Sequence, residues 1–201
     1  MSQAQYEFTN DWFARHVPAW KRIFAPPRQR PSRVLEIGSF EGQSTVWTME
    51  NLLAEQGGLI VAVDPWEEGP GAPQKGMQPV EARFDRNISI AARRFPTVRV
   101  EKNKGPSTLV LSALVARGEK FDFIYVDGDH RAPQVLTDMV LAFHLCKVNG
   151  LIFCDDYLHM QHLGLVESPK LAIDAFTTCF HFQTRIFPEW LVQLYLEKVA
   201  D

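Results

Sequence analysis

The chain has 201 residues, enough for one domain with a sizeable core and too few for two full enzyme domains. Its 21 Lys and Arg residues against 24 Asp and Glu residues give a formal net charge of −3, which argues against a nucleic acid partner. No apolar run approaches the length of a membrane span, and the polar N-terminus does not resemble a signal peptide. We therefore expect one cytoplasmic domain over residues 1–201, without a nucleic acid or membrane partner.

The N-terminal region shows apolar residues at helical spacing over 6–24, which predicts a helical extension within residues 1–30. Trp12, Trp20 and Trp190 are expected in the core. A proline-rich segment at 25–31 then indicates a linker.

The rest of the chain alternates apolar runs of strand length with segments of helical periodicity. Strands are expected at 34–37, 59–63, 98–100, 121–126, 151–154, 182–187 and 190–197, and helices at 42–55, 80–95, 107–117, 135–146 and 171–180. This order predicts a mostly parallel sheet covered by helices on both faces, ending in an antiparallel hairpin with a tight connection at 188–189. Residues 65–79 are rich in Gly and Pro and indicate a lid-like loop.

The three cysteines, Cys146, Cys154 and Cys179, follow apolar neighbours and have no metal-ligand spacing. We expect three buried, reduced thiols.

A Gly-x-x-x-Gly pair follows the first predicted strand. Gly38 allows a tight turn, and Gly42 opens the next helix, so a ligand can approach backbone N–H groups there. The spacing differs from the Gly-x-Gly-x-x-Gly of dinucleotide-binding enzymes. Asp64 ends the second strand, 22 residues after Gly42. An acidic side chain at this place either binds the hydroxyls of a ribose or caps the following segment.

Acidic residues also end the fourth and fifth predicted strands, in Asp127-Gly-Asp-His130 and Asp155-Asp156. Adjacent parallel strands lie about 4.8 Å apart, so these carboxylates can converge, and clustered carboxylates suit hard cations such as Mg²⁺. Alternatively, some of them cap the following helices.

Histidines near these acids allow a second interpretation. His159 and His162 could add imidazole ligands and favour zinc or iron, but a place in a surface loop or substrate pocket is the favoured interpretation. His16 lies in an apolar stretch and is expected to be structural.

The segment Val-Leu-Glu-Ile-Gly-Ser-Phe-Glu-Gly-Gln-Ser-Thr at 34–45 resembles the first motif of catechol O-methyltransferase-like enzymes. Further motifs follow in that family's order at 105–107, 125–130 and 149–156, while Asp-Gly-Asp-His and residues 168–176 look like cephalosporin hydroxylase-type and sugar O-methyltransferase-type proteins. The resemblance covers residues 34–199. It implies a class I methyltransferase that uses S-adenosylmethionine (SAM), with a Rossmann-like α/β sandwich and a seven-stranded, mostly parallel sheet in the order 3-2-1-4-5-7-6.

The resemblance also implies roles for individual residues. The methionine part of SAM would be surrounded by Glu36, Gly38, Ser39, Phe40, Gly42 and Ser44. The ribose would lie at Asp64 and Trp66, and the adenine at Gly105 and Ser107. A divalent cation, expected to be Mg²⁺, would be bound by Asp127, Asp155 and Asp156, with Asp127 also beside the cofactor.

Asp127 and His130 are the candidate catalytic residues. Catechol-type enzymes place a lysine general base where this chain has His130. A neutral histidine can accept a proton near pH 7, but His130 could equally contact only the cofactor or the substrate.

These features predict metal-assisted O-methylation of a small hydroxylated metabolite or sugar. A nicotinamide-dependent oxidoreductase is the main alternative, and the glycine spacing argues against it. A non-catalytic SAM- or nucleotide-binding subunit is the other, and the acidic cluster argues against it. The acceptor stays open, as does assembly into a homo-oligomer.

Overall fold

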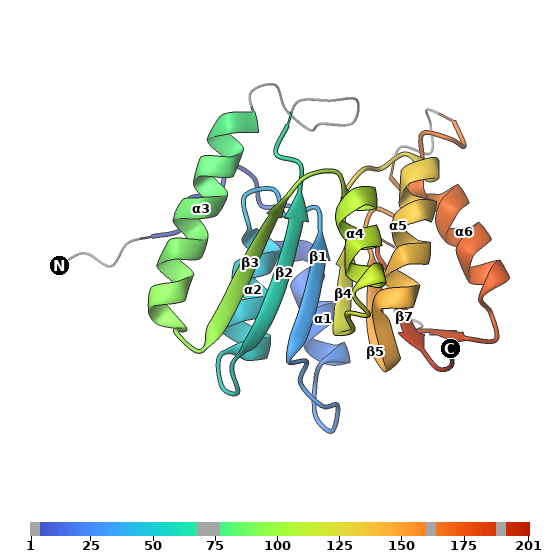
Figure 1. Cartoon of the computed structure of the whole chain (residues 1–201), viewed down its shortest axis with the longest axis horizontal. Coiled ribbons are helices and arrows are strands. Elements are labelled where there is room, and N and C mark those ends of the chain that lie inside the picture. Colours follow the sequence, from blue (N-terminus) through green and yellow to red (C-terminus); the bar gives the residue numbers. More distant parts are fainter. Residues whose placement is uncertain (1–4, 68–76, 160–163, 188–191) are drawn as a thin grey trace.

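The computed structural model describes residues 5–67, 77–159, 164–187 and 192–201. A seven-stranded sheet runs through the molecule in the order β3-β2-β1-β4-β5-β7-β6 (Figure 1). The strands are β1 (Arg33–Ile37), β2 (Gly58–Asp64), β3 (Val98–Lys104), β4 (Phe121–Val126), β5 (Cys146–Cys154), β6 (Thr184–Ile186) and β7 (Leu194–Lys198). The first five strands are parallel, and β7 runs antiparallel to both β5 and β6. The predicted strand order and terminal antiparallel pair are confirmed.

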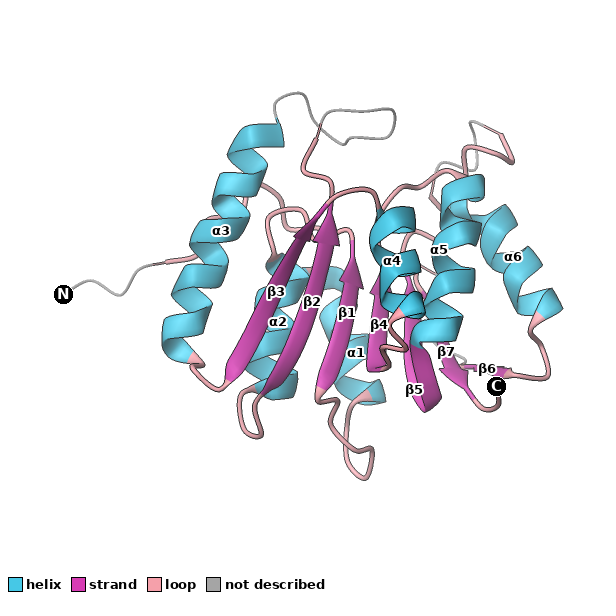
Figure 2. Ribbon diagram, in the orientation of Figure 1, coloured by secondary structure: helices cyan, strands magenta, loops and turns pink. Residues whose placement is uncertain are grey.

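Helices cover both faces of this sheet (Figure 2). They are η1 (Ala14–His16), α1 (Val17–Ile23), α2 (Gln43–Thr48), η2 (Met49–Leu53), α3 (Met77–Arg94), α4 (Ser107–Ala116), α5 (Ala132–Leu145) and α6 (Pro169–Cys179). Alternate strand residues point to opposite faces. Leu35 and Ile37 therefore lie in one apolar cluster with residues of α4, α5 and α6, whereas Val34 lies in another with residues of α1 and α2. Both faces are apolar, which explains why the strands read as continuous apolar runs.

From residue 5, where the described part of the chain begins, the N-terminal region is helical only at residues 14–23, so the prediction of helix over residues 6–13 is wrong. Residues 5–13 instead lie along the glycine loop and α3, where side chains bind their backbone. The Glu7 amide donates to Asn87 Oδ1 at 2.8 Å, and the Thr9 amide donates to Glu41 Oε2 at 2.7 Å. Pro18 does not interrupt α1, because it lies in the first turn, where no N–H is needed.

Two other predictions of burial are wrong. Trp20 is fully buried, as expected, but Trp12 is 51% exposed and only packs its ring on Phe40. Cys146 and Cys154 are buried, whereas Cys179 is exposed. The buried stripe of α6 passes through Phe176 towards Phe180 and leaves Cys179 beside it, on the solvent side.

Several predicted features lie wholly or partly outside the described residues. These are most of the lid-like loop, His162, Trp190 and the connection at 188–189. The lid-like loop was predicted to extend to residue 79, but α3 already begins at Met77, so the loop ends earlier than predicted.

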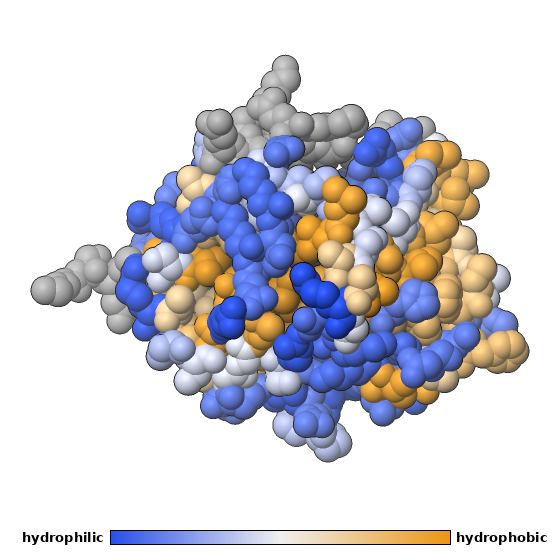
Figure 3. All heavy atoms as spheres, in the orientation of Figure 1, coloured by the Kyte–Doolittle hydropathy of each residue, from blue (hydrophilic) through white to orange (hydrophobic). Residues whose placement is uncertain are grey.

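Exposed apolar side chains gather on the α4–α6 side of the molecule (Figure 3). They include Leu109 at 69% exposure, Leu171 at 42% and Leu136 at 37%. Among the described helices, none is long and apolar enough to cross a membrane.

Candidate active site

The predicted site residues collect along one edge of the sheet, at the carboxyl ends of β1, β2, β4 and β5 (Figure 1). Ligands of open α/β sheets bind at this edge. Three parts lie next to one another there: the glycine loop after β1, the acidic residues after β4 and β5, and the start of α1.

The glycine loop is pinned between its two neighbouring strands. The Gly38 amide donates to Val63 O at 2.8 Å, and the Asp127 amide donates to Ile37 O at 2.8 Å. Gly38 has φ +85°, and a Cβ there would lie 2.0 Å from Asp127 O. Glycine is therefore required at position 38 for two reasons: the backbone angle is positive, and the ends of β1 and β4 leave no room for a side chain.

Asp64 braces this loop from β2. Its Oδ2 accepts hydrogen bonds from the amides of Ser39 and Phe40, both at 3.0 Å, and its Oδ1 accepts one from the Trp66 amide at 2.7 Å. Burial raises the pKa of Asp64, and the three amides oppose that shift. The sequence left two roles open for Asp64, capping of the following segment and binding of a ribose. The hydrogen bond from the Trp66 amide fits the first role, and ribose binding stays a prediction.

Trp66 is buried beneath the same loop rather than open to a ligand. Its indole Nε1 donates to Phe40 O at 2.8 Å, and its ring packs 4.7 Å from that of Phe84. Only 2% of Trp66 is exposed. Its evident role is to support Phe40, which has φ +45°.

Glu36 forms the floor of the glycine loop and is 3% exposed. Its carboxyl group accepts hydrogen bonds from the hydroxyls of Ser44, at 2.5 Å, and Thr45. Burial raises the pKa of Glu36 to about 7, although the Ser44, Thr45 and Ser39 hydroxyls oppose that shift. The Ser39 oxygen is buried and, within the described part of the chain, makes no hydrogen bond of normal geometry. An unpaired buried hydroxyl is costly, so this loop suits a polar ligand.

The junction of β3 and α4 borders the same edge. The Gly105 amide donates to Asp64 O at 3.1 Å, and the Ser107 hydroxyl accepts a hydrogen bond from Gln134 Nε2 at 3.1 Å. The two residues predicted to border the adenine therefore lie next to the end of β2, and the buried Asp138 lies behind them.

Asp127 and Asp155 come together beneath the loop, as predicted from the strand ends. The Tyr125 hydroxyl donates to Asp155 Oδ2, and the Asp156 amide donates to Asp155 Oδ1 at 2.7 Å. Burial, followed by the charges of Asp155 and Asp156, raises the pKa of Asp127 well above its usual range. A bound cation would relieve this concentration of negative charge.

Asp129 does not join the cluster. Its carboxylate forms an ion pair with Arg131 and accepts the Arg131 amide at 2.8 Å. Asp129 therefore braces the turn before α5 without capping the helix, whose N-cap residue, Arg131, makes no side-chain capping hydrogen bond.

His16 is the residue that the sequence interpretation missed. It is 4% exposed, and its Nε2 lies 3.5 Å from Asp155 Oδ1. Burial lowers the pKa of His16, and the Asp155 charge opposes that shift. Its neighbour Arg15 lies 3.4 Å from Asp156 Oδ1. No spacing in the sequence indicates this, because α1 reaches the site only through tertiary packing.

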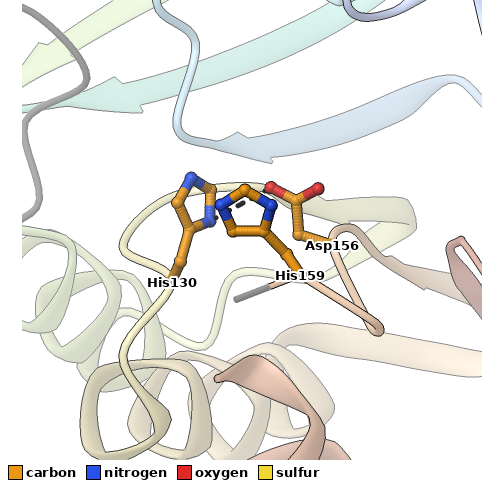
Figure 4. Close-up of side chains that lie close together, drawn as sticks. All are labelled: His130, Asp156 and His159. Atoms are coloured by element: carbon orange, nitrogen blue, oxygen red, sulfur yellow. Dashed lines mark ion pairs between the residues drawn. The ribbon is translucent and has the colours of Figure 1, made fainter. Parts of the chain in front are cut away.

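His130, Asp156 and His159 form a compact group (Figure 4). One ligand atom from each lies within 4.8 Å of the other two, and His130 Nδ1 lies 3.3 Å from Asp156 Oδ2. Among the described residues, this is the one group of three His, Cys, Asp or Glu side chains with that spacing. Of the three predicted cation ligands, Asp127, Asp155 and Asp156, this group contains only Asp156. His159, for which a place in a surface loop or substrate pocket was the favoured interpretation, lies close to Asp156.

Comparison with known proteins places this geometry in a family. A family described as "Methyltransferase domain" matches residues 35–157, which run from β1 through the acidic residues after β5. The chain therefore belongs to this family of methyltransferase domains, and the predicted resemblance is confirmed.

Relatives and solved structures agree with this assignment. The chain is 31% identical to the O-methyltransferase ankF of Aspergillus thermomutatus over 146 residues, 72% of this chain and 52% of that protein. It is 30% identical to the O-methyltransferase hkm8 of Aspergillus hancockii over 143 residues, 71% of this chain and 49% of that one. The chain thus spans about half the length of the curated relatives it matches.

Two solved structures show the same fold. An O-methyltransferase from Bacillus cereus in complex with SAH is 17% identical, with a TM-score of 0.64 over 98% of this chain and 84% of that one. The MycE methyltransferase of the mycinamycin biosynthetic pathway, in complex with Mg and SAH, is 18% identical, with a TM-score of 0.59 over 96% of this chain and 51% of that one. The predicted Rossmann-like methyltransferase sandwich is confirmed.

Proposed function

We propose that this protein is a SAM-dependent O-methyltransferase that acts, as one cytoplasmic domain, on a small hydroxylated acceptor. The observation that carries the proposal is the juxtaposition of a braced glycine loop with buried carboxylates at the ends of β4 and β5. Membership of the methyltransferase domain family and the two O-methyltransferase relatives support it.

The loop after β1 has the chemistry that SAM requires. Glu36 offers a buried carboxyl group for a cationic ligand, and the buried Ser39 hydroxyl makes no hydrogen bond of normal geometry among the described residues. We assign the cofactor to Glu36, Gly38, Ser39, Phe40, Gly42, Ser44, Asp64, Gly105, Ser107 and Asp127, with the buried Trp66 supporting Phe40 from beneath. SAH in complex with the Bacillus cereus enzyme supports this choice of ligand.

The acidic residues define the acceptor side. A divalent cation held beside Asp127, Asp155 and Asp156 would lower the pKa of an acceptor hydroxyl. Mg in the MycE complex supports a cation in such a protein. SAM would supply the methyl group: as the acceptor oxygen bonds to the methyl carbon, the carbon–sulfur bond would break, SAH would leave as a neutral thioether, and the hydroxyl proton would pass to His130 or to water.

His130 belongs to the acceptor side in this proposal, because it contacts Asp156. Its removal should lower kcat by about 10²–10⁴-fold, the range for loss of a group that assists proton transfer, while SAH affinity stays nearly unchanged.

The test is methyl transfer from labelled SAM to a panel of hydroxylated metabolites and sugars, with and without divalent cations. We expect formation of SAH and a labelled ether with at least one acceptor, and loss of turnover in His130→Ala. Labelling of nitrogen or carbon acceptors alone would contradict the proposal. Unchanged turnover after exhaustive chelation would refute the role of the cation.

A further inference from the structure

The group of His130, Asp156 and His159 joins two loops at the edge of the sheet. His130 precedes α5, while Asp156 and His159 follow β5. Figure 4 shows the two imidazoles and the carboxylate turned towards one another. The imidazole rings lie 5.1 Å apart, and all three side chains are partly buried.

The backbone fixes the positions of these side chains. The His159 amide donates to Asp156 O at 2.8 Å, and the Asp156 amide donates to Asp155 Oδ1 at 2.7 Å. The ion pair between Asp129 and Arg131 holds the residues on either side of His130. The group is therefore organised before any ligand arrives, which reduces the entropy lost on binding.

Asp155 is much less available than Asp156 as a ligand. Both of its oxygens already accept hydrogen bonds, from Tyr125 and from the Asp156 amide. Among the described residues, the Asp156 carboxylate forms ion pairs with Arg15, at 3.4 Å, and His130, at 3.3 Å. Within the described residues, the His159 ring contacts the His130 ring and makes no hydrogen bond of its own.

We propose that His130, Asp156 and His159 together bind a divalent first-row transition cation such as Mn²⁺, Fe²⁺, Co²⁺ or Zn²⁺. Imidazole nitrogens favour these ions, whereas Mg²⁺ prefers oxygen ligands and retains its waters. With metal–ligand bonds of about 2.0–2.2 Å, two neighbouring ligand atoms lie roughly 3.3 Å apart around a tetrahedral cation. The spacing of His130 Nδ1 and Asp156 Oδ2 matches that value.

Three protein ligands leave coordination positions open. That an acceptor oxygen takes one of them rests on the proposed function; binding of the cation does not. With Nδ1 bound to the cation, His130 would assist loss of the acceptor proton through the cation, which lowers the pKa of the hydroxyl, rather than by accepting the proton itself.

The test uses the untagged full chain, stripped of metal and titrated with Co²⁺, whose visible absorption reports its ligands. We expect one Co²⁺ per chain, bound more tightly than Mg²⁺. His130→Ala and His159→Ala should each weaken Co²⁺ binding by more than ~100-fold, beyond the loss seen for outer-shell residues. His144→Ala, which removes an exposed histidine from the end of α5, is the matched control and should bind Co²⁺ as the wild type does. Asp155→Asn should retain Co²⁺ within a few-fold.

Two results would overturn the proposal: no binding of Co²⁺ by the wild type, or loss of binding in Asp155→Asn with retention in His159→Ala. The second result would assign the cation to the aspartates alone. SAH affinity, measured on the same samples, separates this inference from the proposed function. Co²⁺ binding without SAH binding would refute the function and leave the cation site intact, and the reverse would refute only the cation site.

Discussion

Asp138 shows how a single buried carboxyl group links this site to stability. It lies on α5 with 1% exposure and accepts a hydrogen bond from Gln134 at 3.0 Å. Burial raises the pKa of Asp138 from 3.8 to about 6, against the hydrogen bonds from Ser107 and Gln134. The folded state therefore binds this proton more tightly than the unfolded state does.

The raised pKa of Asp138 makes the free energy of unfolding depend on pH. Below pH 3.8 the carboxyl group is protonated in both states and carries no penalty. Between pH 3.8 and about 6 the unfolded state ionises first, so the free energy of unfolding falls as pH rises, by on the order of 3 kcal/mol. Asp138→Asn should remove this loss, so its stability relative to the wild type should increase between pH 4 and pH 7.

Urea denaturation of both proteins at the two pH values measures this difference. Asp85→Asn, which changes an exposed carboxylate on α3, serves as the control for general effects of charge. An equal difference between Asp138→Asn and wild type at both pH values would show that the pKa of Asp138 is not raised by folding.

At the scale of elements, α1 connects the core to the active site. Trp20 lies in edge-to-face contact with Phe123, Tyr125 and Phe153 at ring distances of 5.0–5.2 Å, and its Nε1 donates to Gln193 at 2.8 Å. His16, one turn earlier, meets Asp155. The packing of Trp20 therefore sets where His16 lies.

Trp20→Ala should lower the free energy of unfolding by about 3–5 kcal/mol, because it leaves a large cavity. Trp12→Ala is the matched control: its ring is half-exposed, and its loss should cost less than about 1 kcal/mol. Chemical denaturation of the three proteins gives both values. Equal losses in the two variants would contradict the anchoring role of Trp20.

The element types were predictable where local pattern and tertiary environment agree. Strands buried on both faces appear as apolar runs, so β1, β2 and β4 were found at nearly their observed bounds. Residues 5–13 carry apolar side chains at helical spacing but form no helix, because their partners Glu41 and Asn87 lie far along the chain. Local periodicity carries no information about such partners.

For the whole molecule, the meeting of the acids at one edge was predictable because parallel strands end together there. The place of His16 was not, since it depends on how α1 crosses the sheet. The two roles considered for Asp64 require the same residue at the same position, so spacing alone could not choose between them. The pairing of His159 with His130 depends on the turn after β5, for which the sequence has no clear signal.

Calorimetric titration with SAH and with NAD tests whether the loop after β1 binds SAM. We expect one SAH per chain and no heat from NAD. We also expect weaker SAH binding in Asp64→Asn, because one carbonyl oxygen cannot replace a carboxylate that accepts three amides. Binding of NAD without binding of SAH would show that this loop is not a SAM site.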